Sequence, residues 1–278
     1  MTIMAHPKSQ LLSAADCDEC NRIGYRVSTT GEHAKAVLCS CVKTCPSCSG
    51  SGLRLTMRDG FEELAECSCR KCIRRVDCFN ASTIPAGFAT KSLAGFRAET
   101  AEQNRLKTKL IEYQETFSDN TERGFLLIGP PGVGKTHLLA SLLSHITLKL
   151  GRACRFVDFF DLTAQIRSTY RDGSDLAESD LLEPLVNVPV LAIDELGKGR
   201  GSEWELSIID QLISRRYNAG RIVLMATNYY PEGVTPSQGA SVPRQSLEER
   251  MTQRIYSRLR AMCDFAEVSG RDRRTSSP

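Results

Sequence analysis

The sequence predicts an α/β fold with a parallel sheet, preceded by a small cysteine-rich domain. Two observations carry this prediction. After about residue 120, short apolar segments alternate with amphipathic helical patterns, which is typical of a parallel sheet covered by helices on both faces. Ten of the twelve cysteines lie between Cys17 and Cys78, which sets a thiol-rich front apart from the remainder of the chain.

The composition is that of an ordinary globular protein: the 278 residues are 41% hydrophobic and 25% charged, with a formal net charge of +3. This excludes a chain that is mostly disordered, fibrous or embedded in a membrane. The length allows one large domain or two modest ones, and no apolar run approaches the ~18 residues that cross a bilayer. No secretory signal pattern opens the sequence, so we expect a cytoplasmic protein with no membrane partner and with reduced thiols.

The front segment, residues 1–80, contains an internal repeat with a period of 28 residues. Each unit reads CxxC, then a glycine and an arginine, then CxC. The eight repeated cysteines are Cys17, Cys20, Cys39, Cys41, Cys45, Cys48, Cys67 and Cys69. Reduced CxxC and CxC pairs can supply the four corners of a tetrahedral zinc site, so we expect two Zn²⁺ ions and a front that folds only with metal. The ligands of one ion come either from one unit or from exchanged halves of the two.

Four further cysteines lie outside the repeat: Cys72, Cys78, Cys154 and Cys263. We interpret the first two as spare thiols or substitute ligands and the last two as buried packing residues. A closed four-thiolate site has no open position for water, which argues against hydrolytic metal chemistry. The front is therefore expected to present a surface to a protein or nucleic acid. Only two aromatic residues, Tyr25 and Phe61, lie among the repeated cysteines, and this favours a protein partner.

Residues 81–123 are predicted to be a linker and the leading helix of the second domain. The stretch after Cys78, FNASTIPAGFATKSLAGF, is rich in small residues, as connecting segments are. Beyond it, Leu106, Leu110, Tyr113 and Phe117 recur at helical spacing. We expect this amphipathic stripe to pack on its own domain, whose core spans residues 124–278.

The string GFLLIGPPGVGKTHL at 124–138 passes from an apolar strand through a glycine-rich turn into an apolar-periodic helix. This is the context of a P-loop, in which backbone N–H groups and a helix N-terminus surround phosphates. We expect Lys135 to reach the β and γ phosphates of ATP and Thr136 to hold Mg²⁺. The predicted nucleotide-binding residues of the loop are Gly129, Pro130, Pro131, Gly132, Val133, Gly134, Lys135, Thr136 and His137.

Two further apolar strands end in polar residues that complete such a site. VPVLAIDE at 188–195 ends in Asp194, predicted to bind Mg²⁺, and in Glu195, predicted to orient or deprotonate the attacking water. RIVLMATN at 221–228 ends in Asn228, which could hold that water against the γ phosphate. A glutamate beside the metal aspartate favours hydrolysis over transfer to another acceptor. The predicted strands are 125–128, 155–158, 189–193, 222–226 and 265–268.

The string from IDELGKG through SEWELSIIDQLISRRYNAGRIVLMATNYYP, with IPAGF and SLAGF before it and QRIYSRLR and GRDRR after it, resembles AAA+ ATPases of the DnaC/IstB type. The resemblance covers roughly residues 83–274. By matching motif it implies that Asn228 is the first sensor and Arg274 the second sensor. It also implies that Arg258, with Arg254 beside it, is the arginine finger. A finger acts on the site of a neighbouring subunit, which implies self-association through the ATP site.

The resemblance implies a P-loop AAA+ protein that acts in DNA replication as a helicase loader. Its zinc front would bind the replicative helicase, and its ATPase part would touch single-stranded DNA and hydrolyse ATP to release the helicase. Some loaders carry a cysteine-based zinc domain, whereas the transposition helpers carry a helical front, so the zinc front favours a loader. The tandem pair of units departs from the single module expected there. Two alternatives stay open: an IstB-like transposition helper that binds duplex DNA, and a zinc adaptor switched by ATP.

Overall fold

The structure, a computed structural model, describes residues 17–21, 23–40, 45, 47–49, 51–170, 177–199, 201–234 and 245–274. A parallel sheet of five strands forms its centre, in the spatial order β6-β7-β8-β5-β9. Its strands are β5 (Gly124–Ile128), β6 (Cys154–Asp158), β7 (Val190–Asp194), β8 (Ile222–Thr227) and β9 (Cys263–Glu267). The five predicted strands and their parallel arrangement are confirmed, with ends shifted by one or two residues.

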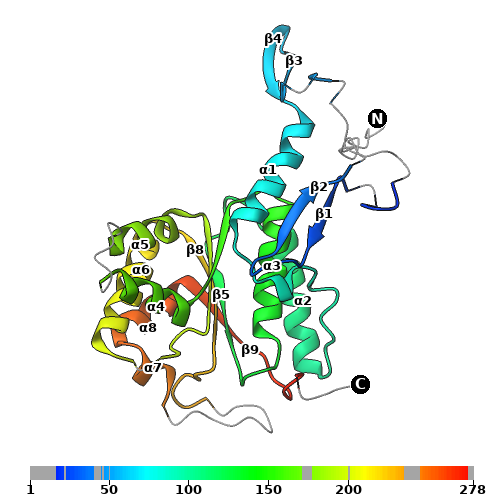
Figure 1. Cartoon of the computed structure of the whole chain (residues 1–278). Coiled ribbons are helices and arrows are strands. Elements are labelled where there is room, and N and C mark those ends of the chain that lie inside the picture. Colours follow the sequence, from blue (N-terminus) through cyan, green and yellow to red (C-terminus); the bar gives the residue numbers. More distant parts are fainter. Residues whose placement is uncertain are drawn as a thin grey trace.

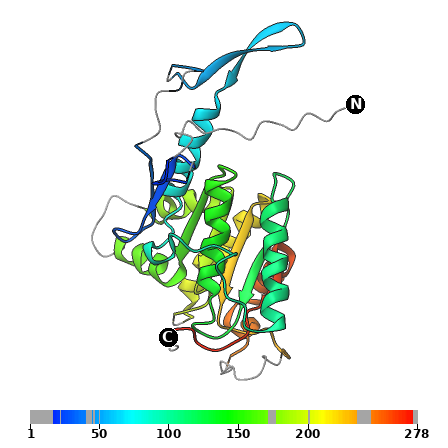
Figure 2. The ribbon, with the colours of Figure 1, turned by 90° about the vertical axis from the view of Figure 1, so that its right-hand side faces the viewer.

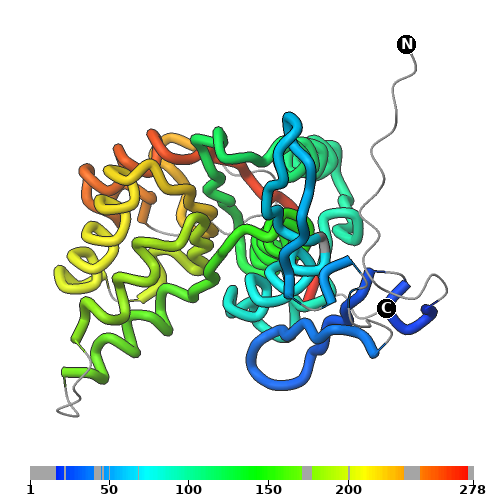
Figure 3. Tube along the Cα trace, turned by 90° about the horizontal axis from the view of Figure 1, so that it is seen from above, coloured from blue at the N-terminus to red at the C-terminus, as the bar shows by residue number. Residues whose placement is uncertain are grey.

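Helices cover both faces of this sheet, as Figures 1 and 3 show. One face carries α2 (Ala101–Thr116) and α3 (Lys135–Leu148), and the helix predicted from the apolar stripe near residue 106 is α2. The other face carries α4 (Phe159–Thr169), α5 (Glu178–Asn187), α6 (Glu203–Asn218), α7 (Leu247–Arg250) and α8 (Gln253–Met262). The three central strands, β5, β7 and β8, are buried along their whole length because both faces are covered, whereas the edge strands β6 and β9 are partly exposed.

Several helices begin where a short polar side chain accepts a hydrogen bond from the first turn. Ser202 starts α6 with a capping box, because its hydroxyl accepts from the backbone N–H of Glu205 while the Glu205 carboxylate accepts from the N–H of Ser202. The hydroxyls of Thr100 and Thr252 accept from the backbone N–H groups of Gln103 and Ile255 at the starts of α2 and α8. The Ser202 cap marks where α6 begins on the segment that follows β7.

The front of the chain consists of two antiparallel hairpins and a helix. The first hairpin pairs β1 (Tyr25–Ser28) with β2 (Lys35–Leu38), and the second pairs β3 (Leu53–Arg58) with β4 (Phe61–Glu66). The 28-residue repeat thus appears as two hairpins, since Tyr25 and Leu53 open equivalent strands one period apart. Helix α1 (Ser68–Ala81) follows, and a short 3₁₀ turn, η1 (Ala86–Phe88), comes after it.

The first hairpin is packed onto the same core as the sheet. The side-chain amide of Asn80 pairs with the backbone of Ala36, accepting from its N–H at 2.7 Å and donating to its carbonyl at 2.9 Å. Tyr25, Val76 and Phe79 are buried in one cluster with residues of α3 and β5. The core is therefore continuous across residue 80, where the sequence predicts a domain boundary, because α1 packs along α3.

The second hairpin stands clear of the sheet and its helices, at the far end of α1 (Figures 1 and 2). Its turn is Asp59-Gly60, with φ of 51° and 86°, the left-handed pair that a two-residue hairpin turn requires. The two repeated units therefore have different surroundings, one packed on the core and one extended into solvent.

A buried arginine joins the helices of one face to the starts of two strands. Arg216 on α6 is fully buried, and its guanidinium donates to five carbonyls that lie at the end of α5, in the connection from α5 to β7 and at the start of β8. These carbonyls belong to Leu185, Val186, Val188, Pro189 and Ile222. Burial lowers the pKa of Arg216 to about 9, so it keeps its charge at neutral pH.

We expect Arg216→Ala to lower the free energy of unfolding by about 3 kcal/mol or more, because it leaves buried carbonyls without donors. The matched control is its neighbour Arg215→Ala, which removes only an exposed ion pair with Glu183 and should cost under about 1 kcal/mol. Urea unfolding of both variants measures the difference. Equal losses would show that the five carbonyl contacts contribute little.

Candidate nucleotide-binding site and cysteine clusters

Three strand ends meet at one edge of the sheet. Strand β8 lies between β5 and β7, and parallel strands end at the same edge. The residues that follow these strands therefore converge: Lys135 after the loop of β5, Asp194 at the end of β7 and Asn228 after β8. The sheet brings together the residues that the sequence predicts for ATP binding.

The P-loop has the backbone shape that its glycines allow. Gly132 and Gly134 have φ of 79° and 107°, in the left-handed region. A Cβ on Gly129 would lie 2.3 Å from the carbonyl oxygen of Val268, so only glycine fits where β5 turns into the loop. Pro131 is exposed and Val133 is fully buried, which anchors one side of the loop in the core.

The lysine of the loop is folded back onto hydrogen-bond acceptors. Lys135 Nζ lies 2.7 Å from the carbonyl oxygen of Gly129, 2.8 Å from that of Pro130 and 2.7 Å from Asn228 Oδ1. Burial lowers the pKa of Lys135 to about 8, although the nearby carboxylates of Asp194 and Glu195 act to raise it. These acceptors hold the ammonium group at the point where the phosphates of a nucleotide would compete for it.

The residues predicted to hold Mg²⁺ are in direct contact. Thr136 Oγ1 donates to Asp194 Oδ2 at 2.6 Å, and the backbone N–H of Glu195 donates to the other carboxylate oxygen at 3.0 Å. Burial raises the pKa of Asp194, while the hydrogen bond from Thr136 acts to lower it. A hydroxyl and a carboxylate side by side are hard oxygen ligands of the kind that Mg²⁺ takes beside phosphate oxygens. The pair therefore fits the predicted ion.

Glu195 is held in a strained backbone position next to Asn228. Its φ is 54°, which is unusual for a residue other than glycine. Asn228 Nδ2 lies 3.4 Å from Glu195 Oε2, and Lys198 Nζ lies 3.9 Å from the same oxygen. A cavity of about 250 Å³ opens beside these residues, also lined by Tyr229. This cavity can hold a small molecule beside the carboxylate of Glu195 and the amide of Asn228.

The segment after β9 crosses the P-loop. The backbone N–H of Arg273 donates to the carbonyl of Gly132 at 3.1 Å, and the Asp272 carboxylate lies where a Cβ on Gly132 would be. Arg274 pairs with Asp272 through two nitrogens, at 3.1 and 2.9 Å. Its charge acts to lower the pKa of Lys135. Arg274, predicted as the second sensor, thus lies within electrostatic reach of the loop.

Sequence reasoning missed the residues that support this crossing segment. Phe96 packs against Gly134 and lies 4.4 Å from the guanidinium of Arg273, measured to its ring centroid. Gln103, which is buried, donates to the carbonyl of Ser269 at 2.5 Å. Phe96 lies in the SLAGF string, which entered the resemblance without a role. Its proximity to the P-loop depends on a contact between distant parts of the chain, so spacing could not reveal it.

Two further predicted residues have partners outside the P-loop. His137 Nε2 lies 3.0 Å from the carbonyl oxygen of Ser92, and its ring meets Phe96 edge-on. Arg258 on α8 donates to Ser214 at 2.6 Å and to Asp210 at 3.1 Å, both on α6. Arg254, beside it, pairs with the same Asp210 at 3.6 Å. The assignment of Arg258 as an arginine finger stays a prediction.

The repeated cysteines gather within their own units. The sulfurs of Cys45, Cys48, Cys67 and Cys69 all lie within 4.8 Å of one another. Cys48 Sγ is 3.4 Å from Cys69 Sγ, and Cys45 Sγ is 3.6 Å from Cys67 Sγ. Zinc–sulfur bonds of about 2.3 Å place tetrahedral ligands about 3.8 Å apart, so this cluster fits a zinc ion.

The first unit forms a matching cluster. Cys17, Cys20 and Cys39 lie within 4.8 Å of one another, with 3.7 Å between the sulfurs of Cys17 and Cys39. Cys41, the predicted fourth ligand, lies outside the described residues. Each cluster contains cysteines of one unit only, so the described cysteines of the two units are not mixed in one site. Cys72 is buried in the core, and zinc binding itself stays a prediction.

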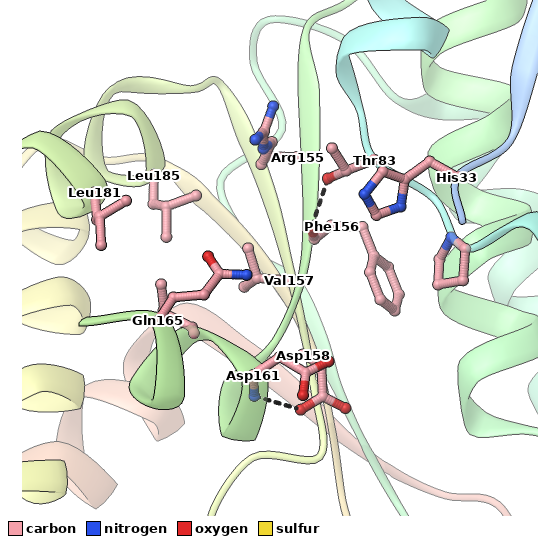
Figure 4. Close-up of a pocket in the computed structure, with 12 residues that line it drawn as sticks. His33, Thr83, Arg155, Phe156, Val157, Asp158, Asp161, Gln165, Leu181 and Leu185 are labelled. Carbon is pink, nitrogen blue, oxygen red and sulfur yellow. Dashed lines mark hydrogen bonds between the residues drawn. The ribbon is translucent and has the colours of Figure 1, made fainter. Parts of the chain in front are cut away.

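A separate cavity of about 220 Å³ lies at the outer edge of the sheet, beside β6 (Figure 4). The hydroxyl of Thr83 donates a hydrogen bond to the carbonyl of Phe156 there, and the carboxylate of Asp158 accepts one from the N–H of Asp161 at the start of α4. Among the described residues, none of those predicted for ATP or zinc lines it. Within the described ranges, no helix is long and apolar enough to span a membrane.

Comparison with known proteins identifies relatives of the ATPase part. The family described as "IstB-like ATP binding protein" matches residues 62–275, more than half of the chain. The replicative helicase loader DnaC of Escherichia coli strain K12 is 33% identical over 164 residues, which are 59% of this chain and 66% of that protein. The DnaC of Buchnera aphidicola subsp. Acyrthosiphon pisum is 30% identical over 151 residues, 54% of this chain and 61% of that protein. The chain thus matches just under two thirds of the length of these relatives.

A solved structure supports the same relationship. The crystal structure of the DnaC helicase loader superposes with a TM-score of 0.56 at 27% identity, covering 66% of this chain and 99% of that chain. The parallel order of the five strands, with the P-loop strand between β8 and β9, is accordingly an AAA+ arrangement.

We expect the affinity for ATP to fall at alkaline pH, because only the charged form of Lys135 attracts phosphate. With a pKa of about 8 in the free protein, the dissociation constant should rise about eightfold from pH 7.5 to 9. Titration with a fluorescent ATP analogue measures it. Arg274→Gln should shift the profile to higher pH, since the Arg274 charge acts to lower that pKa. A dissociation constant independent of pH in the wild-type chain would contradict the buried state of Lys135.

We expect two zinc ions per chain by elemental analysis, and one in either Cys39→Ser or Cys67→Ser. Cys39→Ser should also lower the melting temperature of the ATPase part by several degrees, because the first hairpin shares its core. Cys67→Ser should leave that temperature nearly unchanged. The control Cys154→Ser, outside both clusters, should retain both ions. Full zinc content in the two cluster variants would disprove the assignment.

Proposed function

Because this chain belongs to the family of IstB-like ATP-binding proteins, we propose that it hydrolyses ATP and acts as a loader of a replicative helicase. The observation that carries the ATPase half is the convergence of Lys135, Thr136, Asp194, Glu195 and Asn228 at one sheet edge. The loader half is supported by 33% identity to a protein named as a replicative helicase loader.

Each residue of the site has a distinct part in hydrolysis. Lys135 would leave its loop carbonyls for the β and γ phosphates, and Thr136 and Asp194 would hold Mg²⁺, which neutralises phosphate charge. Glu195 would orient the attacking water and accept its proton at Oε2. Asn228, 3.4 Å from that oxygen, would fix the water on its other side.

Self-association is part of the proposal. Arg258 is hydrogen-bonded to Asp210 and Ser214 of α6. As an arginine finger it would act on the site of a neighbouring subunit. Arg274 would serve the site of its own chain, because it pairs with Asp272 at the P-loop. Contact with single-stranded DNA and a cytoplasmic location belong to the same proposal, since a loader meets DNA and helicase there.

The front is proposed to bind zinc at two sites and to contact the helicase. The four clustered sulfurs of the second unit fit a tetrahedral ion, and the first unit repeats the pattern. A protein partner is favoured over nucleic acid because aromatic side chains for stacking are few.

We expect Glu195→Gln to bind ATP with nearly unchanged affinity and to hydrolyse it about 100-fold more slowly or worse, because the amide accepts no proton. In the presence of ATP, the same variant should bind the host replicative helicase and fail to release it, because release is proposed to need hydrolysis. Glu203→Gln, an exposed glutamate at the start of α6, is the matched control and should behave as wild type. Turnover and helicase pull-down with ATP or ADP measure both effects.

Two outcomes would redirect the proposal. If the wild-type chain does not bind the helicase and instead coats duplex DNA in the presence of ATP, it is a transposition-type helper and not a loader. If Glu195→Gln turns over ATP as fast as the Glu203→Gln control, the catalytic assignment of Glu195 is wrong.

A further inference from the structure

We propose that the β3–β4 hairpin is the surface with which this chain grips its protein partner, through one apolar face of four side chains. That face consists of Leu53, Leu55, Met57 and Leu64 and is called the hairpin face below. The inference deepens the proposed function and rests on it, since the partner in question is the replicative helicase.

The hairpins of the two cysteine units have different surroundings. The first hairpin is packed into the ATPase core through Tyr25 and Ala36 and is bonded to α1 by Asn80. Its inner face is therefore already occupied. The second hairpin stands clear of the body at the far end of α1 (Figures 1 and 2). Of the two repeats, only the second has a hairpin that extends into solvent and is available to a partner.

The strand register sorts the second hairpin into two faces. Leu55 lies opposite Leu64, and Leu53 and Met57 flank Leu55 on β3, so these four side chains share one face. The same register places Arg54, Arg58 and Phe61 on the opposite face. One side of the ribbon is thus mostly apolar and the other mostly polar.

The apolar side chains of the hairpin face are largely exposed to solvent. Leu55, Met57 and Leu64 are 64%, 68% and 65% exposed, and Leu53 is 39% exposed. A solvated two-stranded hairpin is only marginally stable in water, so something must hold it. The cysteine cluster holds its root, because Cys67 follows β4 directly and Cys45 and Cys48 precede β3. The root is fixed while the apolar face stays uncovered, as in contiguous patches that bind partners.

The charge of the hairpin selects the chemistry of the partner. Residues 53–66 carry two arginines against four acidic residues, a net charge of −2. Glu62 and Glu66 lie on the same side of the ribbon, bordering the hairpin face opposite Met57 and Leu53. Nucleic acid would be repelled by this charge. The face fits a protein surface with an apolar centre and a border of lysine or arginine side chains.

Helix α1 fixes where that partner sits. Its 14 residues, at about 1.5 Å each, hold the hairpin about 20 Å from the helix end that packs on the core. Arg74 donates to the carbonyl of Gly151, just past the end of the P-loop helix α3, at 3.2 Å. A partner held by the hairpin face is therefore carried on a helix packed against α3.

The test uses the full-length, zinc-loaded chain and the host replicative helicase, with the dissociation constant measured by titration calorimetry. The triple variant Leu55→Ser, Met57→Ser, Leu64→Ser removes the centre of the hairpin face. We expect at least a tenfold loss of helicase affinity, with zinc content and ATP turnover unchanged. The matched control, Arg54→Ser, Arg58→Ser, Phe61→Ser, changes three exposed side chains of the opposite face and should lose less than about threefold.

A charge reversal tests the border of the partner surface separately. Glu62→Lys should weaken helicase binding several-fold at low salt, and the difference should shrink at high salt. Equal binding by Glu62→Lys and wild type at low salt would overturn the basic border.

The remaining outcomes each decide one point. If wild type binds the helicase and the triple variant binds equally well, the inference is wrong while the proposed function stands. Equal losses in the triple variant and its control would also overturn it. If the triple variant changes the oligomeric state in light scattering and keeps helicase affinity, a second copy of this chain covers the face instead. If wild type does not bind the helicase, the proposed function fails and the inference fails with it.

Discussion

The position of β8 between β5 and β7 is the constraint on which the nucleotide site depends. Parallel strands end at one edge, so this order sets Asn228 between the P-loop and the Asp194–Glu195 pair. A strand order that separated β5 from β8 would leave Lys135 and Asn228 too far apart for their 2.7 Å hydrogen bond. The covering helices serve this arrangement, because they bury the strands on both faces.

Burial gives the site its electrostatic character. Lys135 and Asp194 lie in low-dielectric surroundings, which shifts the pKa of each toward its neutral form. A hydrogen bond to Asn228 holds the ammonium group of Lys135, and a hydrogen bond from Thr136 holds the carboxylate of Asp194. A bound nucleotide would bring negative phosphates to the ammonium group of Lys135, and its metal ion would bring positive charge to the carboxylate of Asp194. The site is thus arranged to favour the bound state, in which those charges are paired.

The front contains two units with the same cysteine pattern in different surroundings. Both units have the same cysteine spacing, and both gather their described sulfurs within 4.8 Å. Only the first hairpin meets Asn80 and the core beneath α1, whereas the second is carried away from the body by the same helix. The two units also differ in their place along the chain relative to α1, which directly follows only the second.

The sequence by itself determined the local chemistry: the P-loop string, the carboxylates after β7, the five strands and the cysteine spacing all follow from residue type and period. Such features depend on neighbours within a few residues. The tertiary structure decided the contacts between distant segments, such as Phe96 against Gly134, Asp272 on Gly132 and Arg258 beside Asp210. It also decided that the core continues past residue 80 and that each cysteine cluster stays within its unit. No local pattern records these contacts, because they arise only when packing of the whole chain brings separate elements together.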